Sequence, residues 1–123
     1  MSETPLPEPP AAVARQLAAY NAGDLDTFCA CYTDGVVLED GASGVFVRGQ
    51  GELRARYGTL FRDHPENRAR VLNRSVVLPW VFEEELVTRD AVAPDGARTP
   101  TERRVMVVYL LEKDLIARGT FYR

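Results

Sequence analysis

Apolar residues recur at helical spacing in the first half of the chain. Val13, Leu17 and Tyr20 fall three or four residues apart, which places them on one face of a helix. Gly23 can end this helix, and Asp24 is a typical N-cap for the next one. The sequence therefore predicts three helices: from about Ala11 to Gly23, from Asp24 to Asp34, and from beyond Gly49 to His64.

The later part of the chain is rich in valine, leucine and aromatic residues, which favour β-strands. Pro94-Asp95-Gly96 and Lys113-Asp114 separate neighbouring segments, as turn residues do in β-hairpins. The predicted strands are residues 36–40, 69–78, 81–92, 103–112 and 115–122, with a minor strand at 45–48. Early helices followed by a long antiparallel meander indicate an α+β fold.

Length and composition are those of one folded domain. The chain has 123 residues, of which 46% are hydrophobic and 27% are charged. Residues 1–10 contain four prolines and almost no large apolar side chains, which predicts a flexible, proline-rich tail. We therefore expect a single domain over residues 11–123.

Charge and cysteine content disfavour several classes of function. The formal net charge is −3, so there is no basic field to hold nucleic acid or an anionic membrane surface. No segment has the roughly 20 apolar residues of a membrane helix, and the N-terminus lacks signal-peptide features, so we expect a cytoplasmic protein. Cys29 and Cys31 are expected to be buried thiols. The sequence has no histidine pair, cysteine cluster or phosphate-binding glycine loop, so neither a metal nor another cofactor is expected.

Three short motifs carry a family resemblance. Asn21-Ala22-Gly23-Asp24-Leu25, Cys31-Tyr32-Thr33-Asp34 and Val37-Leu38-Glu39-Asp40 resemble the NTF2-like superfamily in its SnoaL-like and ketosteroid isomerase-like branch. The resemblance implies a cone-shaped fold, in which three N-terminal helices pack on a curved, mainly antiparallel sheet around one pocket. It also implies a homodimer. Members with different tasks share these motifs, so they indicate the fold rather than the reaction.

The resemblance also implies roles for individual residues. Asp40 occupies the position of the isomerase general base, and Tyr32 and Tyr57 match supporting tyrosines of some members. Gln16 and Met106, however, stand where the isomerase has the tyrosine and the protonated aspartate of its oxyanion hole. Loss of one such donor typically costs ~10² to 10³ in rate, so an enzyme of this type would have to stabilise an enolate in another way.

Judged from the residues alone, Asp40 has two alternative roles. The period of a strand places Val36, Leu38 and Asp40 on one face, so the carboxylate shares that face with apolar groups. Desolvation there would raise the pKa of Asp40 and favour a general base. The alternative is that Asp40 caps the loop formed by residues 41–44.

Tyrosines on the apolar faces of the helices are candidates for lining a pocket. Tyr20, Tyr32 and Tyr57 come from three predicted helices and would bring their hydroxyl groups toward one interior, where each needs a partner. The alternative is a core or rim position with the hydroxyl in water. Phe28 and Phe61 could likewise line the cavity, and the alternative is that they are plain core residues.

The acidic run at residues 83–85 alternates between the two faces of a predicted strand. Glu84 shares its face with Phe82 and Leu86, which makes it a candidate second acid beside Asp40, whereas its two neighbours are expected to meet solvent or arginines. The candidate ligand-binding residues are Gln16, Tyr20, Phe28, Tyr32, Tyr57, Phe61, Glu84 and Met106.

Two functions remain open from the sequence. In the first, the pocket binds a small apolar molecule without turnover. In the second, the protein is a cofactor-independent isomerase, dehydratase or hydrolase-like enzyme in which Asp40 is the general base.

Overall fold

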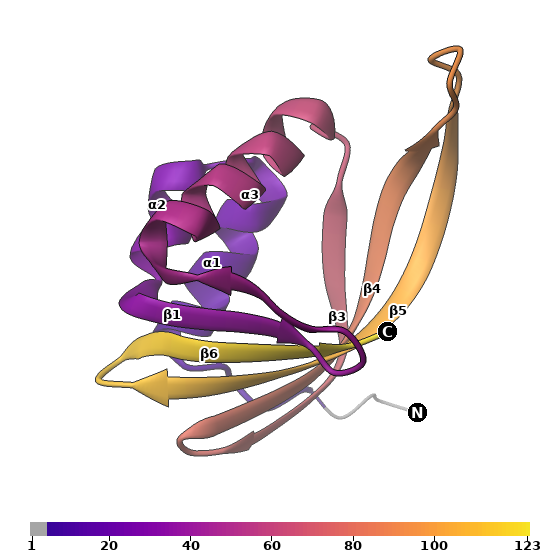
Figure 1. The fold of residues 1–123 in the computed structure, drawn as a ribbon. Coiled ribbons are helices and arrows are strands. Elements are labelled where there is room, and N and C mark those ends of the chain that lie inside the picture. The colour runs from indigo at the N-terminus through magenta and orange to yellow at the C-terminus, as the bar shows by residue number, and fades with distance from the viewer. Residues whose placement is uncertain (1–4) are drawn as a thin grey trace.

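The computed structural model describes residues 5–123 of the chain. In chain order its elements are α1 (Ala11–Ala22), α2 (Leu25–Ala30), β1 (Tyr32–Asp40), β2 (Gly44–Arg48), α3 (Gly49–Asp63), β3 (Arg68–Val77), β4 (Trp80–Val92), β5 (Arg98–Glu112) and β6 (Leu115–Tyr122). The six strands form one sheet in the order β2-β1-β6-β5-β4-β3. β1 and β6 run parallel, and the other neighbouring strands run antiparallel. The helices lie along one side of the sheet (Figure 1), which confirms the predicted α+β class.

Local signals set the first helix boundaries largely as predicted. Gly23 ends α1 with a left-handed φ of 68°, and the Asp24 side chain caps α2 by accepting a hydrogen bond from the Thr27 backbone N–H at 3.2 Å. The prediction that α2 continues past Tyr32 is wrong. Tyr32 belongs to β1 and pairs with Ile116 of β6, so long-range strand pairing outweighs the helical spacing of this segment.

The strand register assigns the residues of β4 to opposite faces of the sheet. Val81, Glu83 and Glu85 are buried on the inner face, toward the helices, whereas Trp80 and Phe82 are exposed on the outer face. The antiparallel partners on β5 follow the same alternation. β4 therefore turns two acids inward and large apolar groups outward.

The space between sheet and helices is filled mainly by apolar and aromatic side chains. Leu38, Leu53 and Ile116 are fully buried. The ring of Phe28 packs against those of Tyr57 and Phe61, with centroids 4.6 Å and 5.5 Å away. This aromatic cluster joins α2 to α3 and forms one boundary of the interior.

Both cysteines are buried and unpaired, as predicted. Burial raises the pKa of the Cys29 and Cys31 thiols, which keeps them protonated and unreactive. In the part of the chain that the structure describes, no helix is both long enough and apolar enough to cross a membrane.

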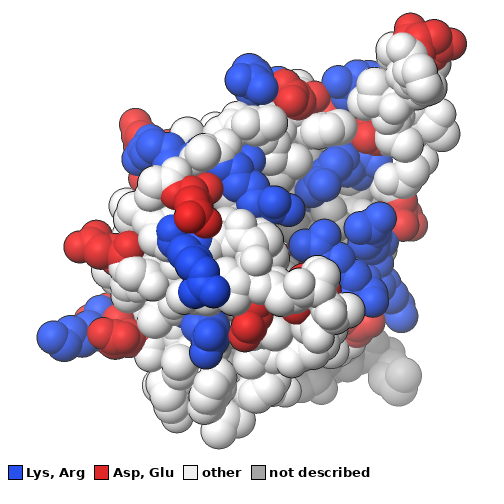
Figure 2. Space-filling model, viewed as in Figure 1, with Lys and Arg blue, Asp and Glu red and all other residues white. Residues whose placement is uncertain are grey.

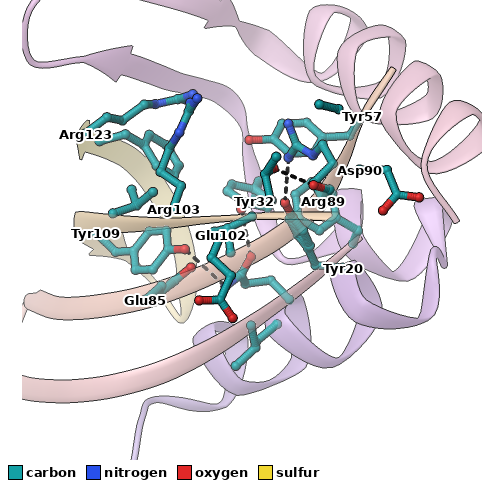
Figure 3. A pocket seen from close by; sticks show the side chains of 18 residues that line it. Tyr20, Tyr32, Tyr57, Glu85, Arg89, Asp90, Glu102, Arg103, Tyr109 and Arg123 are labelled. Carbon is teal, nitrogen blue, oxygen red and sulfur yellow. Dashed lines mark hydrogen bonds between the residues drawn. The ribbon is translucent and has the colours of Figure 1, made fainter. Parts of the chain in front are cut away.

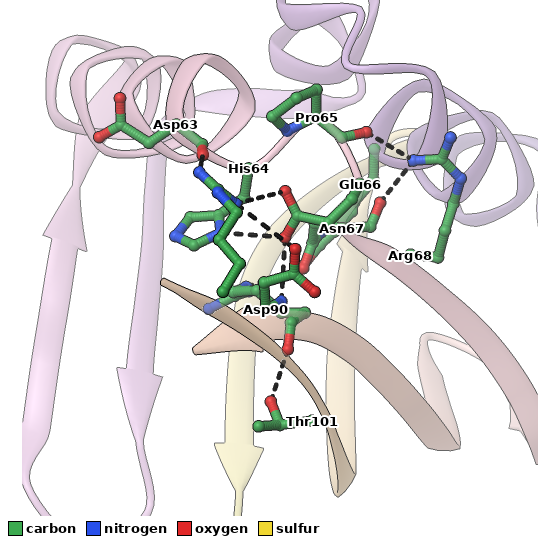
Figure 4. A network of polar contacts seen from close by, with 11 residues as sticks. Asp63, His64, Pro65, Glu66, Asn67, Arg68, Asp90 and Thr101 are labelled. Atoms are coloured by element: carbon green, nitrogen blue, oxygen red, sulfur yellow. Dashed lines mark hydrogen bonds and ion pairs between the residues drawn. The ribbon is translucent and has the colours of Figure 1, made fainter. Parts of the chain in front are cut away.

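Glu66 ties the end of α3 to the β4–β5 hairpin (Figure 4). Its carboxylate accepts hydrogen bonds from the Asp90 backbone N–H at 3.0 Å and from Arg98 Nη1 at 3.2 Å, and it lies 3.0 Å from Nδ1 of His64. The Asp90 N–H and His64 lower the pKa of Glu66 to about 2.

Two element boundaries in this region can be compared with the prediction. α3 ends at Asp63 with His64 as its C-cap residue, where the sequence predicts the end of the helix. The ladder continues to the pair Val92 and Arg98, so β5 begins earlier than predicted.

Candidate functional site

A cavity of about 380 Å³ lies between the helices and the inner face of β4, β5 and β6 (Figure 3). This volume is in the range of small-molecule pockets. The structure brings five of the predicted residues together around it, namely Gln16, Tyr20, Phe28, Tyr32 and Tyr57. The sheet adds residues that were not predicted for this site, including Glu85, Val87, Val105 and Tyr109, and it also contributes Phe121.

A chain of hydrogen bonds crosses the floor of the cavity. The Tyr32 hydroxyl donates to Oε1 of Gln16 at 3.1 Å, and Nε2 of Gln16 donates to the Tyr109 hydroxyl oxygen at 3.2 Å. Burial raises the pKa of both tyrosines well above the ordinary value, so both hydroxyl groups keep their protons. In this direction of donation, the hydrogen of the Tyr109 hydroxyl has no acceptor among residues 5–123 and can meet a ligand oxygen.

Glu85 is a buried carboxyl group at the same floor. Its side chain is 7% exposed, and its Oε2 atom has no hydrogen-bond partner among residues 5–123. The adjacent Glu83 is fully buried and forms an ion pair with Arg74, whose Nε atom lies 2.7 Å from Oε2 of Glu83. Its other oxygen also lacks a partner.

One proton shared between these two carboxyl groups explains both unpartnered oxygens. Burial, followed by the hydrogen bond and the repulsion from Glu83, raises the pKa of Glu85 to about 8. Two carboxylates cannot bond to each other unless one is protonated. Glu85 therefore holds a proton at neutral pH, and the residue lines the cavity.

Arginines surround the mouth of the cavity, namely Arg89, Arg103 and Arg123. Arg89 is fixed in place because Nε donates to Oδ1 of Asn67 at 2.8 Å and Nη2 donates to the Tyr20 hydroxyl at 3.3 Å. Figure 3 shows Arg103 and Arg123 converging on one side of the opening. None of these three arginines was predicted from the sequence as a site residue.

Asp40 does not line this cavity. Its Oδ1 atom accepts hydrogen bonds from the backbone N–H groups of Ala42 at 2.8 Å and Ser43 at 3.2 Å, and its Oδ2 atom lies 3.4 Å from Nε of Arg123. The expectation of a raised pKa is wrong, because these backbone donors, followed by Arg123, lower the pKa of Asp40. The geometry is that of the alternative role, a cap on the loop after β1.

Three other predicted residues also lie outside the cavity. Glu84 and Met106 are cross-strand partners on the outer face, where Arg104 Nη1 lies 3.4 Å from Oε2 of Glu84. The expectation that Glu84 turns inward fails because it follows Phe82 and Leu86 to the outer face. Phe61 packs behind Tyr20 and Phe28 without reaching the cavity.

The sequence contains a signal for the inward position of Glu85, but the signal that favours Glu84 is stronger. Period two places Val81, Glu83, Glu85 and Val87 on one face of the strand, so the acids are flanked by apolar residues. Phe82 and its neighbours give the opposite face a larger apolar area, which favoured the wrong assignment. Only the tertiary structure shows that this larger apolar face lies outside.

A second groove of about 690 Å³ runs along α3 beside the cavity. Much of its lining is exposed, including Glu52, Ala55, Arg56, Thr59 and Asp63, so it encloses a ligand less well. Within residues 5–123, no group of three or more His, Cys, Asp or Glu side chains is arranged to hold a metal ion.

Comparison with known proteins identifies relatives by sequence and by structure. The family model described as "SnoaL-like domain" matches residues 13–119. A solved structure of an uncharacterized cystatin fold protein from Novosphingobium aromaticivorans is 30% identical, with a TM-score of 0.81, and the match covers 91% of this chain and 95% of that chain. Among functionally curated proteins, none matches this sequence significantly.

Two more distant structures show similarity of fold alone. One is a hypothetical protein with a ketosteroid isomerase-like fold from Catenulispora acidiphila, in complex with trimethylamine, at 14% identity, a TM-score of 0.80, and coverage of 94% of this chain and 87% of that chain. The other is an LEH-like epoxide hydrolase from M. tuberculosis, at 18% identity, a TM-score of 0.77, and coverage of 92% of this chain and 80% of that chain.

Proposed function

We propose that this chain, which belongs to the SnoaL-like domain family of the NTF2-like superfamily, binds in its cavity one small, largely apolar molecule that carries a polar oxygen. Aromatic and aliphatic side chains form the walls, and a few polar groups converge at the floor. The observation that carries the proposal is the buried carboxyl group of Glu85, which lines the cavity among apolar and aromatic side chains.

A ligand oxygen at the floor would satisfy groups that the protein leaves open. An unsatisfied buried polar atom costs about 1 to 3 kcal/mol, and a partner in the cavity recovers part of this. The Tyr109 hydroxyl is available as a donor, and the Glu85 oxygen that does not bond to Glu83 can accept a hydrogen bond. Tyr109 can orient a carbonyl or ether oxygen, and a ligand hydroxyl can use both groups, while Phe28 and Phe121 contact the apolar part of the molecule.

Titration calorimetry with a series of alkyl phenyl ketones tests the binding function. We expect saturable binding at one site, and Tyr109→Phe should weaken it roughly threefold to tenfold, because one net hydrogen bond is worth about 1 kcal/mol. Tyr122→Phe is the matched control, since Tyr122 is 52% exposed on the outer face. Absence of saturable binding, or an equal loss in both variants, would count against the proposal.

A second candidate function is acid–base catalysis without a cofactor, and the raised pKa of Glu85 favours it. A group with a pKa of about 8 gives up and takes back a proton near neutral pH. Glu85 would be the proton carrier in place of Asp40, whose carboxylate is engaged by two backbone donors and lies beside Arg123. The chemistry it supports is proton transfer at, or next to, the bound oxygen.

Solvent deuterium exchange separates catalysis from binding. If Glu85 transfers protons, the wild-type protein should speed incorporation of deuterium beside the ketone carbonyl, and Glu85→Gln should bind the same ketone without speeding the exchange. Glu84→Gln is the control, because this neighbouring acid faces the outside. Binding without exchange by the wild type would leave a binding protein.

A further inference from the structure

Arginines are the most numerous charged residues at the mouth of the cavity. Arg103 lies opposite Val87 in the register of β4 and β5, so its side chain shares the inner face with the cavity wall. Arg89, two residues beyond Val87, lies on the same face. The acids in this stretch, Asp90 and Glu102, also line the cavity. Oδ2 of Asp90 lies 3.6 Å from Nη1 of Arg98, so this carboxylate already has a basic partner. The three arginines outnumber these two acids, which gives the mouth an excess of positive charge.

Two of the three arginines at the opening, Arg89 and Arg103, take part in no ion pair within residues 5–123. Arg123 has one acidic neighbour, Asp40, with 3.4 Å between Nε of Arg123 and Oδ2 of Asp40. Like charges that converge without a counter-charge repel one another, and a bound anion removes that repulsion.

The local charge is opposite to that of the whole protein. The chain has a formal net charge of −3, so the excess of arginine at the opening is a local feature. Figure 2 shows basic side chains gathered between α3 and the β4–β5 hairpin. The acid at the cavity floor, Glu85, holds a proton and adds no negative charge there at neutral pH.

The geometry points to an organic anion as the ligand: a molecule with a polar oxygen at the Glu85 floor, an apolar body, and a carboxylate or similar anionic group at the Arg103 and Arg123 mouth. This inference rests on the proposed binding function. Val87, which pairs with Arg103, lies two residues after Glu85 along β4, and Arg89 lies four residues after it. At the rise of a strand these steps correspond to about 7 and 13 Å. The anionic group should therefore lie roughly 7 to 13 Å from the polar oxygen.

A matched pair of probes tests this inference. Para-acetylhydrocinnamate has a ketone oxygen, an aromatic body and a carboxylate in the required order, and its methyl ester differs by loss of the charge. Calorimetric titration should show tighter binding of the acid than of the ester, and this preference should shrink as salt is added. Arg103→Gln should weaken binding of the acid about threefold to tenfold and leave binding of the ester unchanged.

Arg104→Gln is the control, because Arg104 follows directly on β5 but lies beside Glu84 on the outer face. Loss of the acid preference in Arg103→Gln and its retention in Arg104→Gln support the inference. Equal binding of acid and ester by the wild type, or tighter binding of the ester, overturns the inference and leaves the binding function standing. If neither probe binds, the binding function itself fails, and the inference fails with it.

Discussion

Replacing Glu85 by glutamine should make the protein's stability less dependent on pH. The folded state raises the pKa of this carboxyl group from 4.5 to about 8, so it favours the protonated form. The stabilisation of that form is complete below about pH 4.5 and is lost as the pH rises toward 8, where the buried group must ionise. Glutamine has nearly the same shape as a protonated glutamate, can donate to Glu83, and cannot ionise.

The magnitude follows from the pKa difference. Each unit of pKa corresponds to about 1.4 kcal/mol, so ionisation of Glu85 costs the wild type roughly 4 kcal/mol between pH 5 and pH 8.5. Solvent screening reduces this little, because the side chain is only 7% exposed. The free energy of unfolding of Glu85→Gln, relative to wild type, should therefore rise by roughly this amount over the same range.

Urea unfolding at several pH values measures this difference. Glu84→Gln is the control, since its carboxylate accepts a hydrogen bond from Asn73 on the outer face. If the profile of Glu85→Gln runs parallel to those of the control and the wild type, the raised pKa and the proton shared with Glu83 are refuted. If the stability of the variant relative to wild type rises progressively between about pH 5 and pH 8, both are supported.

Three further predictions test the packing, the loop and the outer face. Gly119→Ala should lower the free energy of unfolding by about 1 to 3 kcal/mol, because an added Cβ would lie 2.9 Å from Cδ2 of the buried Leu38. Gly35→Ala meets no atom within 4 Å and is the control, so equal losses in urea unfolding would contradict this packing. Asp40→Ala should speed amide hydrogen exchange at Ala42 and Ser43, the two donors to its carboxylate, and unchanged exchange there would refute the capping role. The exposed Trp80, Phe82, Met106 and Tyr122 form an outer apolar patch suited to a homodimer, so Trp80→Glu with Phe82→Glu should yield monomers in sedimentation analysis, and a monomeric wild type would rule this interface out.

The sequence predicts elements whose signals are local. The stop at Gly23, the N-cap at Asp24 and the two-residue turn at Lys113-Asp114 depend on neighbouring residues, and the structure confirms the helix boundary and the turn. Tyr32 shows the limit of such signals. Its position is fixed by pairing with a strand more than eighty residues later, which helical spacing does not register.

The same limit applies to the candidate site, where residues on helices could be predicted and residues on β4 could not. Helix residues of the cavity, such as Gln16, Tyr20 and Tyr57, could be proposed because a helix has one apolar face, and that face turns inward. β4 has two apolar faces, so alternation alone cannot say which of Glu84 and Glu85 is inside. The exposed patch of the outer face carries the larger apolar side chains, and it misled the assignment.

Asp40 and Glu85 show that the local environment sets the protonation state of a carboxyl group, which a resemblance in position does not reveal. At Asp40, backbone N–H groups donate to the carboxylate, and each such bond favours the charged form. At Glu85, burial and a neighbouring carboxyl group favour the neutral form. Only a neutral acid can donate a proton at pH 7. The residue that resembles the isomerase base in position therefore holds the loop and lies beside Arg123, while Glu85 is mostly neutral at pH 7.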